Sequence, residues 1–98
     1  MHTTNFEQAL KTVILAESLC ISHLNELMFR EHPSKEDVKR GYVLTNDLGL
    51  AVVAALESFQ MSAPHMITHK SLQLLQHANL THSESLLLLE QISTKCLR

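Results

Sequence analysis

Two prolines, Pro33 and Pro64, are the strongest breaks in the chain. Proline has no backbone N–H and disfavours helical geometry in the residue before it, so a helix ends at or before each of these positions. The remaining composition favours helices between the breaks, because two glycines, three phenylalanines and one tyrosine are few for a turn-rich β sandwich. We therefore expect an all-α fold.

Length and charge limit the classes of protein that the chain can belong to. Its 98 residues allow a single helical domain over 1–98, and a chain of this size buries roughly two-thirds of its unfolded surface. A hydrophobic content of 45% argues against disorder. A net charge of −2 provides no basic excess to neutralise phosphates, so nucleic acid is not an expected partner.

The first predicted helix covers about residues 5–30 and has one polar residue in its apolar stripe. Glu17 occupies a slot that the spacing assigns to the core, and we expect it to reach the interface edge or meet a cation such as Lys39 or Arg40. The stripe has the four-then-three spacing of an amphipathic helix. Its apolar members are Phe6, Leu10, Val13, Cys20, Leu24 and Leu27.

This helix carries more apolar residues than one packing partner can cover. Ile14, Ile21 and Met28 lie seven residues apart on a flanking face, and Leu15 and Leu19 add a third face. Such a surplus indicates an oligomer or a bound partner.

The second predicted helix covers about residues 35–60. Ser34 can cap its N-terminus, and Glu36 and Asp37 complement the helix dipole in the first turn. Its inner stripe is Val38, Tyr42, Thr45, Leu48, Val52, Ala55 and Phe59.

Two glycines lie inside this second helix. Gly41 and Gly49 are each four residues from Thr45, so the three form a narrow strip of small side chains that lets another helix approach closely. Each glycine costs about 1 kcal/mol relative to alanine, and the alternative is a helix that breaks near Asn46 and Asp47. The apolar period continues through that point and favours a continuous helix.

The sequence predicts two short helices in the last third of the chain. Thr68 can cap a helix over 69–78, and Thr81 with Glu84 has the spacing of a capping box that would begin another over 82–96. The two long helices are then expected to form an antiparallel hairpin, which the two short ones cannot cover from end to end.

A second subunit would complete the bundle, so we predict a homodimer of two hairpins. Its predicted interface is the apolar stripe of the first helix together with the small-residue strip and its neighbours. The residues are Leu10, Val13, Cys20, Leu24, Gly41, Thr45, Leu48, Gly49 and Val52.

Histidine is abundant, with seven in the chain. His65 and His69 have the i, i+4 spacing that suits a borderline metal, and His77 lies two turns further on. No acid between Glu57 and Glu84 is available to complete a ligand set, so we expect neither a metal nor a cofactor. A metal- or pH-responsive sensor built on these histidines is one alternative function.

A DNA-binding regulator is the other alternative, because residues 71–92 have the cadence of a helix-turn-helix with its turn at 79–81. The would-be recognition helix has no cation before Lys95, which argues against it.

We find no nucleophile, glycine loop or paired acid that would assemble a catalytic site. The expected function is therefore that of a small, non-enzymatic, adaptor-like regulatory protein that associates with itself and with another protein through helical surfaces. Glu7 and Glu17 argue against a signal peptide, and no apolar run approaches the ~20 residues that span a bilayer. We expect a cytoplasmic protein that does not contact membranes.

Overall fold

Three helices make up the part of the chain that the structure describes. The structure is a computed structural model, and it describes residues 6–61 and 68–96, with the side chains of 95 and 96 excepted. The helices are α1 (Phe6–Phe29), α2 (Lys35–Met61) and α3 (His69–Cys96), and no strand occurs over the same residues. The predicted all-α fold is confirmed.

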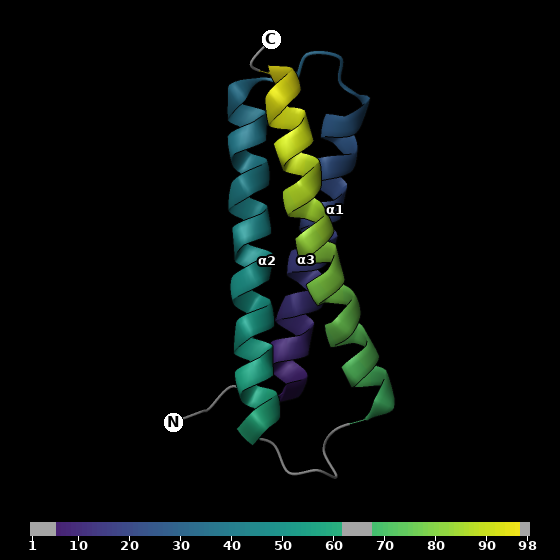
Figure 1. Cartoon of the computed structure of the whole chain (residues 1–98). Coiled ribbons are helices and arrows are strands. Elements are labelled where there is room, and N and C mark those ends of the chain that lie inside the picture. Colours follow the sequence, from purple (N-terminus) through teal and green to yellow (C-terminus); the bar gives the residue numbers. More distant parts are fainter. Residues whose placement is uncertain (1–5, 62–67, 97–98) are drawn as a thin grey trace.

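The helices lie side by side and alternate in direction. In Figure 1, α1 and α3 run upward and α2 runs downward. Each helix packs against both others, so the buried side chains meet along a central axis shared by all three. One chain therefore builds a closed three-helix core.

Two predicted caps set the starts of α2 and α3. The Ser34 Oγ accepts a hydrogen bond from the backbone N–H of Asp37 at 3.0 Å. The Thr68 Oγ1 accepts one from the N–H of Ser71 at 3.0 Å, and the N–H of Thr68 donates to Ser71 Oγ at 3.1 Å. These bonds satisfy N–H groups that a helix leaves without a partner in its first turn.

The prediction of two short C-terminal helices is wrong, because α3 is continuous from 69 to 96. Thr81 lies in its middle and is half-buried, so it caps nothing. The buried positions keep the three-and-four spacing of a single helix through this point, with His82 half-buried and Ser85 buried on the same side. Since 79–81 form no turn, the helix-turn-helix considered as an alternative over 71–92 is absent too.

The small-residue strip brings α2 against α3. A Cβ atom on Gly41 would lie 2.7 Å from Cδ2 of Leu89, and one on Gly49 would lie 2.6 Å from Nε2 of His82. Both distances are shorter than any ordinary carbon contact. The strip admits a helix closely, as predicted, but that helix belongs to the same chain. α2 is also continuous through Asn46 and Asp47.

This contact predicts an unusual response to a helix-favouring substitution. Gly41→Ala should lower the free energy of unfolding by about 1 to 2 kcal/mol, because the clash with the buried Leu89 outweighs the gain in helix propensity. Asn46→Ala, at an exposed site one turn away, should instead raise it by about 0.5 kcal/mol. Urea denaturation followed by circular dichroism measures both, and a stabilised Gly41→Ala variant would contradict the close packing.

Candidate interaction surface

The nine residues predicted as a dimer interface lie inside the chain. Gly49 is half-buried, and the other eight are buried against the other helices: Leu10, Val13, Cys20, Leu24, Gly41, Thr45, Leu48 and Val52. These positions are occupied by intramolecular packing. Self-association stays a prediction, and its surface has to be sought among exposed residues.

A buried polar contact joins all three helices at the centre of the bundle. The thiol of Cys20, which is free and fully buried, lies 3.4 Å from Thr45 Oγ1 and donates to Ser85 Oγ at 3.5 Å. Because the thiol has one proton, the Thr45 hydroxyl donates to Cys20 Sγ. Each helix contributes one member, so the contact favours one register of the helices. Reactive cysteines are accessible thiolates, and this one is enclosed.

Glu17 contacts a different side chain from those predicted. Its Oε2 lies 2.9 Å from Nδ1 of His77 on α3, where the expected partners were Lys39 and Arg40. The Glu17 side chain is only 16% exposed, whereas His77 is 66% exposed. The contact links α1 to α3 at the bundle surface.

The other described histidines do not converge on one site. His23 donates through Nε2 to the carbonyl oxygen of Asp37 at 2.8 Å, and His82 packs against Gly49. His69 is exposed at the start of α3, and His65 lies outside the described residues. Over residues 6–61 and 68–94, no three His, Cys, Asp or Glu side chains are grouped as a metal site would require.

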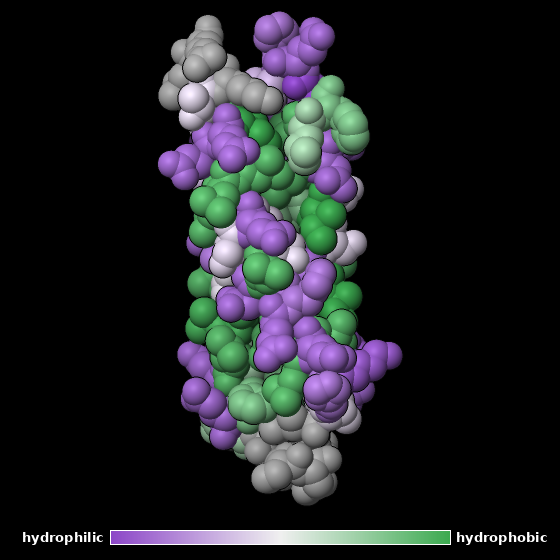
Figure 2. Space-filling view, turned by 45° about the vertical axis from the view of Figure 1, so that its right-hand side comes forward, coloured by the Kyte–Doolittle hydropathy of each residue, from purple (hydrophilic) through white to green (hydrophobic). Residues whose placement is uncertain are grey.

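Many large apolar side chains lie on the surface although the core is complete. Sixteen large apolar side chains are exposed among the described residues, and all three helices contribute to them. Figure 2 shows hydrophobic residues along the length of one face, interleaved with hydrophilic ones. The most exposed on the helix bodies are Leu15, Leu50 and Leu87, each at 62%, one on each helix. Where exposed apolar side chains cluster, they are candidates for interaction sites in soluble proteins.

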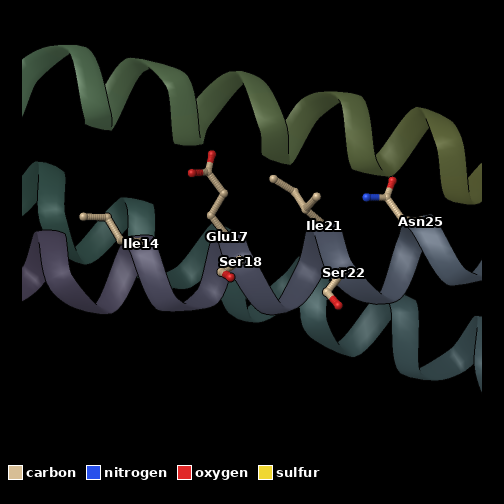
Figure 3. A pocket seen from close by; sticks show the side chains of 6 residues that line it. All are labelled: Ile14, Glu17, Ser18, Ile21, Ser22 and Asn25. Carbon is tan, nitrogen blue, oxygen red and sulfur yellow. The ribbon is translucent and has the colours of Figure 1, made fainter.

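A shallow, open depression of about 520 Å³ lies along α1. It is lined by Ile14, Glu17, Ser18, Ile21, Ser22 and Asn25. In Figure 3, Glu17, Ile21 and Asn25 point from α1 toward α3, whereas Ile14 extends along α1. Sites for small molecules enclose most of their ligand, so the open shape favours a macromolecular surface.

The side of α1 that faces away from the bundle has a simple pattern, and we call it the outer face of α1. It comprises Leu15, Ser18, Leu19 and Ser22, bounded by Lys11 and Glu26, and all six are exposed. Between the two bounding charges the sequence contains one charged residue, Glu17, which contacts α3. The outer face therefore has no charge over three turns.

One helix has membrane-like composition. Among the described helices, α2 is long and apolar enough to cross a membrane by length and composition alone, although polar residues interrupt its apolar run. Only 22% of the apolar window is buried in the structure. Core helices of globular proteins pass the same test.

Comparison of the chain with family models, curated proteins and solved structures finds no match.

The buried position of the predicted interface has a measurable consequence. Leu24→Arg should lower the free energy of unfolding by about 4 kcal/mol or more, since it places an unpaired charge in the three-helix core. Leu19→Arg, on the same helix but half-exposed, should change it by less than about 0.5 kcal/mol. Thermal melting of both variants gives the comparison. A folded Leu24→Arg monomer would show that Leu24 faces a partner and not the core.

Proposed function

We propose that this chain is a non-catalytic interaction protein that binds other proteins through the outward sides of its helices. The observation that carries the proposal is the set of sixteen exposed large apolar side chains on a bundle that already buries its own core. Their removal from water stabilises association by roughly 25 cal/mol per Å² of apolar area.

The shape of the surface supports a helical partner. Straight, rod-like faces with rows of aliphatic side chains pack as ridges into the grooves of another helix. The depression along α1 is open and has a single acid, Glu17, which is engaged by His77. These features favour a protein surface over a substrate pocket.

Neither alternative function gains a specific observation. DNA recognition through residues 71–92 needs a turn between two helices, and α3 is continuous there. A metal-dependent sensor needs converging ligands; of the three predicted ones, His77 contacts Glu17, His69 is exposed at the start of α3, and His65 lies outside the described residues.

Site-specific photo-crosslinking tests the proposal. A photoreactive residue at Leu15, Leu50 or Leu87 should give discrete adducts with another polypeptide in an extract of the source cells, for at least one of the three. The same residue at Gln76, an exposed polar position on α3, is the matched control. Absence of adducts at all three leucines, or equal adducts at Gln76, would contradict a specific interaction surface.

Removal of the exposed leucines should leave the fold intact. The triple variant Leu15→Ser, Leu50→Ser, Leu87→Ser should unfold with a free energy within about 1.5 kcal/mol of the parent, because surface substitutions change it by about 0.5 kcal/mol each. Denaturant titration measures this value. A much larger loss would place these side chains in the core.

A further inference from the structure

The outer face of α1 is complementary to itself when reversed. The six residues of the outer face form three pairs around the midpoint between Ser18 and Leu19. The two members of each pair are equally far from the midpoint along the sequence and differ in charge or in size. Lys11 and Glu26 are equally distant from the midpoint and opposite in charge. Leu15 and Ser22 are equally distant, one large and one small, as are Ser18 and Leu19 themselves.

If two copies of α1 packed antiparallel around that midpoint, each residue of the outer face would therefore lie opposite its complementary residue on the other copy. Lys11 would meet the partner subunit's Glu26, and Leu15 would lie over the partner subunit's Ser22. The small Ser18 and Ser22 leave room for the leucines and let the helix axes approach. All six side chains are exposed, and neither Lys11 nor Glu26 forms an ion pair with any residue that the structure describes.

We infer that the chain forms a two-fold symmetric dimer through the outer face of α1, with the two α1 helices antiparallel. This inference rests on the proposed function and names the partner as a second copy. A two-fold interface uses the same patch on both subunits, so the patch must be complementary to itself. A patch selected for an unrelated protein has no reason to place opposite charges at equal distances from one midpoint.

The dimer is expected to be weak and reversible. The outer face runs from Lys11 to Glu26, so it is about 22 Å long and about 10 Å wide. That footprint is below the roughly 800 Å² per partner of a standard stable interface. We expect a dissociation constant on the order of 10 µM.

Charge reversal gives the most specific test. Sedimentation equilibrium of the purified chain from about 1 to about 500 µM covers the expected range. Lys11→Glu alone and Glu26→Lys alone should each raise the dissociation constant roughly tenfold, because each places like charges at two symmetric contacts. The double variant should restore the parental constant. An equimolar mixture of the two single variants should form mixed dimers.

Leucine substitutions of matched exposure test the location. Leu15→Glu should abolish the dimer, whereas Leu50→Glu on α2 and Leu87→Glu on α3 should leave it unchanged, since the three leucines are equally exposed at 62%. Circular dichroism of each variant confirms that the helices remain folded. Lys11→Glu and Glu26→Lys also test whether the interface lies on α1, and they leave the apolar contacts unchanged.

Each contrary result is decisive. A parent chain that stays monomeric across the concentration range overturns the inferred dimer, and adducts with another polypeptide in extracts would then still support the proposed function. A dimer lost in Leu50→Glu or Leu87→Glu but kept in Leu15→Glu places self-association on another helix. Failure of the double charge reversal to restore the dimer overturns the antiparallel pairing.

Discussion

Gly41, Thr45 and Gly49 let the backbone of α2 lie against α3, and the rest of the bundle follows from this contact. The missing side chains at 41 and 49 make space for Leu89 and His82, and Thr45 lies between them beside Cys20 and Ser85. With α3 held there, the apolar stripe of α1 is covered by its own chain. Overpacking at such a strip is costly because a buried neighbour has nowhere to move.

Once the core is complete, the remaining apolar residues have only the outside of the bundle to occupy. This explains why a chain of modest charge carries exposed aliphatic side chains on all three helices. It also separates two roles within α1. Val13, Cys20 and Leu24 lie in the core of the bundle, whereas Leu15 and Leu19 are exposed on the opposite side, where we propose that a partner binds.

Local signals predicted local structure well. Ser34 and Thr68 cap the helices that they were expected to cap, and the apolar period carried α2 through its two glycines. The prediction that a new helix begins at Thr81 was wrong. The capping-box motif was given more weight than the helical spacing of the core positions, because two of those positions are polar. Ser85 and His82 resemble surface residues, and they are accommodated only because Thr45 and Gly49 face them. That compensation comes from another helix and cannot be read locally.

The same error moved the predicted interface. With α3 divided into two short pieces, the long helices lacked a cover, and residues such as Leu24 and Leu48 were assigned to a second subunit. The partner of Glu17 was misassigned for the same reason, since His77 reaches it only when α3 lies along α1.

Because Cys20 is enclosed, the reactivity of its thiol depends on how often the three helices separate. The thiolate is the nucleophile that reacts with an oxidant or an alkylating reagent, and this sulfur is covered by all three helices. Modification at this position therefore requires the helices to separate first, at a rate limited by how often the bundle opens. Oxidation of Cys20 would then trap opened molecules, because a sulfur carrying added oxygen no longer fits between Thr45 and Ser85.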